Sequence, residues 1–115
     1  MGRRTAGTPA ARLRRLGVRV SDGPWTACGQ KPTGRGGRLI VALGRAAGGA
    51  TTRSRVRRTA REVFATQFGR PARLDVLLLA RGDLSVQPRR QVRARLAELF
   101  TRVSNAVARQ QASHA

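Results

Sequence analysis

Residues 53–64 constrain the fold most, because they place five arginines and one glutamate beside a regular series of apolar residues. When each residue advances by about 100° around a helix axis, the apolar members share one side and the arginines spread over the rest. One face of such a helix needs a protein core, and the other needs an anionic partner. The apolar members are Val56, Ala60, Val63 and Phe64.

The charge of the whole chain points to the same kind of partner. The formal net charge is +19 and the isoelectric point is about 12.0. All basic residues except Lys31 are arginines. A GC-rich coding sequence explains arginine in place of lysine, but it does not explain the scarcity of Asp and Glu. A polyanion would relieve the self-repulsion, so nucleic acid is the first candidate partner and an anionic membrane surface the second.

The composition excludes several classes of site. Cys28 is the single cysteine and His114 the single histidine, so a disulfide, a multi-cysteine metal site and a histidine base are not expected. We predict no catalytic and no metal-binding residue in the protein. No apolar run approaches the ~18 residues of a membrane span, so we expect a cytoplasmic protein without a membrane partner. The few carboxylates fit turns or strand ends, and Glu62 is expected to pair with Arg58 one helical turn away.

Periodicity and turn residues predict seven elements in a single domain. Residues 1–8 lack periodicity and are predicted to be disordered, residues 9–109 form the domain, and residues 110–115 form a flexible tail. Asp22-Gly23 is a hairpin-turn dipeptide, and the apolar run over 74–80 predicts a central strand covered on both faces. The expected elements are a helix over 9–16, strands over 18–20, 25–28 and 38–43, a helix from a cap at Thr51 or Thr52 to 67, the strand over 74–80, and a helix over 89–109. This order, α-β-β-β-α-β-α, predicts a small α+β sandwich.

The loop before the basic helix superficially resembles a nucleotide-binding phosphate loop. Gly44 and Gly49 have the required spacing, but Ala50 stands where lysine is needed, so nucleotide hydrolysis is not expected. The free N–H groups of the helix start, followed by Arg53 and Arg55, still suit an RNA backbone phosphate.

Aromatic residues are too few for a base-stacking platform. Phe64 and Phe100 lie on apolar stripes and are expected in the core. For Trp25 two interpretations stay open: it stacks an unpaired base or it covers the core. Phosphate contact and shape should therefore dominate recognition.

The central stretch resembles the signature of the bacterial ribonuclease P protein component. The residues that carry the resemblance are Gly44-Arg45, Gly48, Ala50, the run Arg53 to Arg58, Arg61-Glu62 and Phe64. It extends over residues 38–104 and is poor before them. Ser54 replaces the family's central Asn. Gly44, Ala46 and Gly49 replace a serine and often basic residues, and Ala65 stands where an arginine is common.

The resemblance implies a cofactor protein that binds the catalytic RNA of ribonuclease P and precursor tRNA, and promotes endonucleolytic removal of the tRNA 5′ leader. The RNA would carry the chemistry and hold the Mg²⁺ ions, and no stable protein partner is expected. A fold like the second domain of ribosomal protein S5 is implied, with a left-handed βαβ crossover around the basic helix and a leader-binding cleft between the sheet and the first helix. The implied RNA-binding residues are Arg45, Gly48, Arg53, Ser54, Arg55, Arg57, Arg58 and Arg61, with Trp25 and Arg38 as possible leader contacts.

The residues alone support only a basic α+β RNA binder, and this leaves an alternative. A structural RNA-binding protein of the ribosome or of another ribonucleoprotein would show the same charge and helix. A membrane-surface or DNA-compacting protein would need the charge alone. The two long predicted helices, however, have a capped, strand-flanked context that a membrane-active helix does not need.

Overall fold

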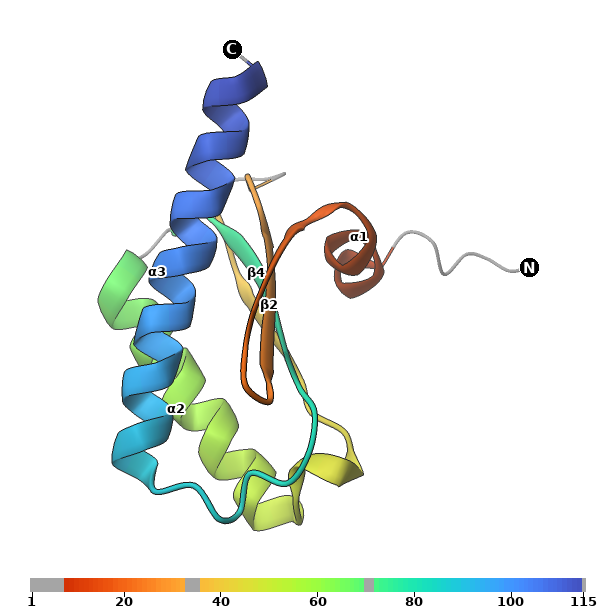
Figure 1. The fold of residues 1–115 in the computed structure, drawn as a ribbon, viewed down its shortest axis with the longest axis vertical. Coiled ribbons are helices and arrows are strands. Elements are labelled where there is room, and N and C mark those ends of the chain that lie inside the picture. Colours follow the sequence, from red (N-terminus) through yellow and green to blue (C-terminus); the bar gives the residue numbers. More distant parts are fainter. Residues whose placement is uncertain (1–7, 33–35, 70–71, 115) are drawn as a thin grey trace, which may run out of the picture.

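In the computed structural model, which describes residues 8–32, 36–69 and 72–114, helices cover both faces of a four-stranded sheet (Figure 1). Helix α1 lies on one face, and α2 and α3 lie on the other. The elements are α1 (Pro9–Leu16), β1 (Val18–Asp22), β2 (Trp25–Gln30), β3 (Leu39–Ala42), a 3-10 turn η2 (Arg45–Ala47), α2 (Ala50–Phe68), β4 (Asp75–Ala80) and α3 (Arg89–His114).

The sheet has the strand order β1-β2-β4-β3. Strands β1 and β2 form an antiparallel hairpin in which Asp22 is opposite Trp25, so the loop is Gly23-Pro24 and Gly23 takes a positive φ of 59°. Strand β4 is antiparallel to β2 and parallel to β3. The predicted α+β order and the interior position of β4 are confirmed. The left-handed sense of the β3–α2–β4 crossover stays a prediction from the resemblance.

The larger core lies between the sheet and the two long helices. Alternation along the strands sends Ala27, Val76 and Leu78 to this side, where they meet the apolar stripes of α2 and α3. A smaller cluster of Leu13, Cys28 and Leu77 packs under α1 on the opposite face. The sheet is therefore buried on both faces in its centre, as the apolar run in β4 predicts.

Three aromatic rings join α2 to α3. The centroid of the Phe64 ring lies 5.0 Å from the Phe68 centroid and 5.7 Å from the Phe100 centroid, and both ring pairs are edge-to-face. Phe100 is fully buried, so the predicted core positions of Phe64 and Phe100 are confirmed. Next to the rings, the Gln67 side-chain amide donates to the Ala97 carbonyl at 3.1 Å.

The helix boundaries differ from the sequence-based expectations at two ends. The expected cap at Thr51 or Thr52 is wrong, because α2 begins at Ala50 and its cap residue is Gly49, which has no side chain to bond. The expected end near residue 67 is confirmed: α2 ends at Phe68, Gly69 has φ 71°, and its N–H donates to the Ala65 carbonyl at 2.9 Å. Helix α3 continues through His114, past the fraying expected from Gln110. Of the predicted disordered segment 1–8, only Thr8, the cap of α1, lies among the described residues.

We expect Phe100→Ala to lower the free energy of unfolding by about 3–5 kcal/mol, because it opens a cavity where both long helices meet. Val86→Ala is the control, since that side chain is 80% exposed and its truncation should change stability by less than about 0.5 kcal/mol. Urea unfolding followed by circular dichroism measures both. Equal midpoints for the two variants would contradict this description of the core.

Candidate nucleic-acid interface

The segment before α2 is held by the loop that follows β4. The Leu84 N–H donates to the Ala47 carbonyl at 2.9 Å. Gly48 has φ 134°, and a Cβ on it would lie 3.0 Å from Cγ2 of Thr52, so this backbone conformation requires glycine. The Ser85 N–H donates to Asp83 Oδ1 at 2.9 Å. This bond, together with the Ser85 hydroxyl, holds the pKa of Asp83 below its usual value.

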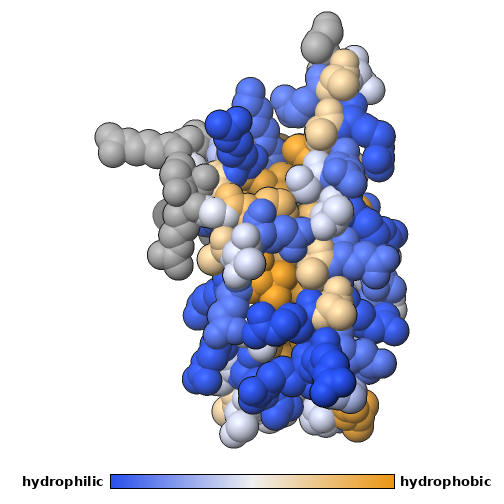
Figure 2. Space-filling view, turned by 90° about the vertical axis from the view of Figure 1, so that its left-hand side faces the viewer, coloured by the Kyte–Doolittle hydropathy of each residue, from blue (hydrophilic) through white to orange (hydrophobic). Residues whose placement is uncertain are grey.

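Four polar residues of α2 form an exposed surface that we call the α2 strip. Their spacing of i, i+3, i+4 and i+7 places them on one side of the helix, away from its buried stripe. They line a hollow of about 340 Å³ together with Glu62. Figure 2 shows that hydrophilic residues dominate the face made by α2 and α3. The α2 strip consists of Ser54, Arg57, Arg58 and Arg61.

The other predicted RNA-binding residues lie outside the α2 strip. Arg53 is half-buried, and its Nε has no hydrogen-bond partner among the described residues. Arg55 is on the flank of α2 that faces the start of α3, where it shares a small hollow with Arg89. Arg45 is exposed in η2, and Gly48 follows it. The structure therefore divides the predicted set into the strip, Arg55 on the α3 flank, the segment before α2, and the half-buried Arg53 in the first turn of α2.

Among the described residues, Glu62 is the acidic residue that lines the hollow of the α2 strip, and it forms an ion pair with Arg93 of α3. Its Oε1 accepts a hydrogen bond from Arg93 Nη2 at 2.6 Å, with both side chains about half exposed. The expected pairing with Arg58 is therefore wrong, because the neighbouring helix offers a cation on the side of α2 that Glu62 faces. An exposed pair of this kind contributes ~0–1 kcal/mol to stability. The pair also directs the Glu62 carboxylate to Arg93 in place of the arginines of the strip.

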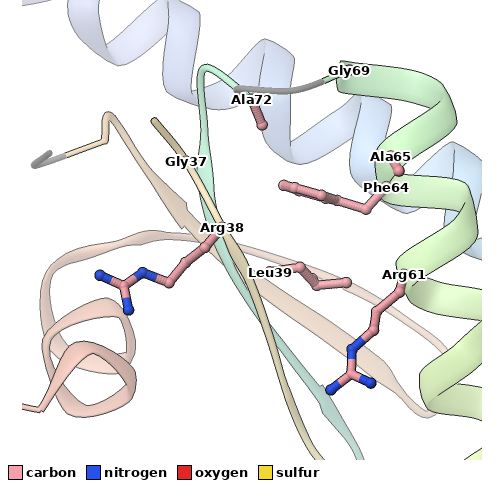
Figure 3. Close-up of a pocket in the computed structure, with 8 residues that line it drawn as sticks. All are labelled: Gly37, Arg38, Leu39, Arg61, Phe64, Ala65, Gly69 and Ala72. Atoms are coloured by element: carbon pink, nitrogen blue, oxygen red, sulfur yellow. The ribbon is translucent and has the colours of Figure 1, made fainter. Parts of the chain in front are cut away.

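A second basic surface lies on the opposite face of the sheet, beside α1. Arg38 and Arg12 line a small hollow of about 50 Å³ between α1, β3 and the start of β4. Figure 3 shows the Arg38 side chain pointing to the α1 side, away from Leu39. The Arg38 backbone N–H donates to the buried Asp75 carboxylate at 3.0 Å, which fixes this end of β3. Arg38 therefore lies beside the space between the sheet and α1, and its contact with the leader stays a prediction.

Trp25 lies on the other side of the sheet and is fully buried in the larger core. A ring without exposed surface cannot stack on a base, so the possible leader contact of Trp25 is wrong and the core interpretation holds. The strand pattern alone could not decide this, because it does not show which face of β2 is buried in the larger core. β2 lies between β1 and β4, and α3 covers its Trp25 side.

Two residues of the α1 face were missed by the sequence analysis, Arg12 and Gln30. Arg12 is exposed on α1 next to the buried Leu13, and Gln30 ends β2 on the α1 face. The Gln30 Oε1 is buried and has no partner among the described residues. The alternation from Cys28 to Gln30 would have placed Gln30 on this face, had the side covered by α1 been known.

Two other kinds of site are absent from residues 8–32, 36–69 and 72–114. No group of three or more His, Cys, Asp and Glu side chains there is close enough to hold a metal ion. No helix in that part of the chain combines the length and the apolar character needed to cross a bilayer.

Comparison with known proteins identifies the family. The sequence model of the family described as ribonuclease P matches residues 11–104, which is most of the chain. The chain belongs to the ribonuclease P protein family. The chain has no match among curated proteins.

Solved structures of ribonuclease P proteins share the fold. The protein from Staphylococcus aureus superposes with a TM-score of 0.70 at 19% identity, covering 78% of this chain and 84% of that one. The protein from Thermotoga maritima, in complex with 1-(4-fluorophenyl)-2-thiourea, gives 0.57 at 21% identity, covering 97% and 94%. A second Thermotoga maritima structure gives 0.58 at 19% identity, covering 85% and 97%. At these identities the likeness establishes the common architecture.

Family membership gives the chain its function, as the protein subunit of the RNA-based enzyme ribonuclease P in tRNA processing. It decides against the alternative of a structural ribosomal or other ribonucleoprotein component, which the charge and the helix alone left open.

We expect Arg93→Ala to weaken RNA binding more than Arg102→Ala, although each removes one exposed charge from α3. Only the first releases the Glu62 carboxylate beside the α2 strip. The additional loss of affinity for Arg93→Ala, a fewfold increase in Kd, should disappear when Glu62→Gln is also present. A double-mutant cycle on the Kd for the ribonuclease P RNA measures this. The same loss for both arginine variants would contradict a role for the Glu62–Arg93 pair.

Proposed function

We propose that the chain binds the catalytic RNA of ribonuclease P through the α2 strip and the segment before α2, and the 5′ leader of precursor tRNA over the α1 face. The observation that carries this proposal is the separation of two basic surfaces by the sheet. The strip lies on the helix layer. Arg12 and Arg38 lie on the opposite side, beside α1. One subunit can thus contact two RNA segments at once.

The mechanism we propose for the subunit is electrostatic. Catalytic RNA and precursor tRNA are both polyanions, and bringing them together costs Coulomb repulsion that Mg²⁺ can offset. A protein with a net charge of +19 neutralises phosphates at their junction and lowers the Mg²⁺ concentration that assembly requires. Arginine suits this role because its planar fork can contact two phosphate oxygens.

The cleavage chemistry in this proposal belongs to the RNA. Mg²⁺ at the RNA active site would supply the activated water and stabilise the leaving oxygen. This chain binds and orients the RNA segments, and its described residues provide no ligand cluster for the metal. We also propose that the chain and these RNA partners are located in the cytoplasm.

The leader contact would depend on shape and charge more than on stacking. The α1 face exposes the Arg12 and Arg38 side chains. The side-chain oxygen Oε1 of Gln30, which has no partner among the described residues, can accept a hydrogen bond from an incoming donor. Because mature tRNA lacks the leader, contacts here favour the precursor over the product. This selectivity distinguishes the α1 face from the α2 strip, which would contact the catalytic RNA in either case.

We expect two double variants to separate the two surfaces. Arg57→Ala with Arg58→Ala should weaken assembly with the catalytic RNA and reduce the slope of log K against log salt by about 0.7–0.9 for each phosphate that the protein no longer neutralises. Arg12→Ala with Arg38→Ala should leave that assembly near its original affinity and reduce the preference for precursor over mature tRNA. Filter binding with each RNA across a salt series measures both effects.

The matched control is Arg102→Ala with Arg109→Ala, which removes two exposed arginines from the later part of α3. It corrects for the change in net charge alone. If all three double variants lose affinity and selectivity equally, the binding is diffuse attraction by a basic protein and the proposed division of surfaces is wrong.

A further inference from the structure

A larger hollow, of about 370 Å³, lies at the free edge of the sheet between β3 and the second half of α2. Figure 3 shows Leu39 pointing into it from β3 and Phe64 from α2, with Ala65 and Arg61 on neighbouring turns of the helix. It is on the helix side of the sheet, so it is separate from the α1 face. It shares Arg61 with the α2 strip and Arg38 with the hollow beside α1, but its apolar residues belong to neither surface.

The floor of this hollow is apolar and fixed in place. Phe64 is held against Phe68 and Phe100 by the edge-to-face contacts at 5.0 and 5.7 Å, and it remains 7% exposed. Leu39 is half-buried, and Ala72 closes the far end. A hollow of this size, left open between rigid walls, can hold a flat group that displaces its water.

The rim supplies polar groups on two sides. Arg61 lines this hollow and also the hollow of the α2 strip, so the two are neighbours on α2. Strand β3 is an edge strand, and the carbonyl of Arg38, the residue just before it, points to β4, where it accepts from the Val76 N–H at 2.9 Å. In a parallel pair the next residue, Leu39, then directs its backbone N–H and C=O to the free edge.

Charge complementarity selects the occupant. None of the eight residues that line the hollow is acidic, and its rim cation continues a surface whose proposed partner is RNA. A nucleobase combines an apolar face, hydrogen-bonding edges for the Leu39 backbone, and a phosphate on either side for Arg61. An apolar protein side chain would match the floor but would leave both the arginine and the backbone groups without partners.

We propose that this hollow takes one unstacked nucleobase of the RNA strand that lies along the α2 strip, with Arg61 contacting a phosphate next to it. The proposal rests on the proposed function, because it requires RNA on the strip. It adds a contact that is independent of charge and that selects RNA with an unpaired nucleotide at this point.

Ala65 controls access to the hollow. It lies on the lining side of α2, half-exposed, where a longer side chain would extend over the floor. Thr66 is the next residue, is exposed, and does not line the hollow. Ala65→Leu and Thr66→Leu therefore form a matched pair, since both place leucine, a good helix former, on the same turn.

The first test uses small ligands and the folded protein. Adenosine or uridine 5′-monophosphate should shift the NMR signals of the Leu39 methyl groups and the Phe64 ring in a saturable way. Ribose 5-phosphate, which has no base, should shift only arginine signals. Ala65→Leu should weaken the nucleotide effect by about fivefold or more, the loss expected for one base contact, and Thr66→Leu should not. If neither nucleotide shifts Leu39 or Phe64, or if ribose 5-phosphate does so equally, the proposal is overturned.

The second test uses the assembled complex. Ala65→Leu should weaken binding of the ribonuclease P RNA by about fivefold or more without changing the salt slope, because no phosphate contact is removed. Equal affinities for the two leucine variants would overturn the base site and leave the proposed function intact. If the Arg57→Ala and Arg58→Ala pair also left assembly unchanged, the proposed function itself would fail.

Discussion

The packing of α2 against α3 and the sheet is the constraint on which the rest of this molecule depends. A helix with five arginines in residues 53–64 stays folded in a chain of net charge +19 because its other face is buried with Phe64 against Phe68 and Phe100. Burial of that face fixes the rotation of the helix. The α2 strip, the Glu62–Arg93 pair and the hollow beside Leu39 all follow from this rotation.

The features of the fold that depend on local chemistry could be predicted from the sequence. The apolar stripe of α2, its stop at Gly69 and the two-sided burial of β4 were all evident from residue spacing. Apart from the cap of α2, which is Gly49 in place of a threonine, the predictions that failed depended on tertiary neighbours. The side of β2 that carries Trp25 faces the core because α3 covers it. Glu62 pairs with Arg93 instead of the expected Arg58 because α3 packs beside α2.

The structure distributes the predicted RNA-binding residues over several surfaces, and their contacts with RNA stay a prediction. Spacing on a helix wheel separates Arg55 from Arg58, but it does not say which side is open, since that depends on where α3 packs. The α1 face could not be assembled from sequence, because Arg12, Gln30 and Arg38 come from three elements that the fold brings together. The sheet then separates this face from the strip, so that in our proposal a small subunit can contact two RNA segments independently.

We propose above all that this chain lowers the Mg²⁺ concentration at which the catalytic RNA acts. The most direct measurement mixes the protein, the ribonuclease P RNA and a precursor tRNA at a Mg²⁺ concentration too low for the RNA alone, and follows release of the 5′ leader. We predict cleavage at the leader junction in the complete mixture and none when either the RNA or the protein is omitted. An unchanged Mg²⁺ requirement with and without the protein, at concentrations where the two are bound, would contradict it.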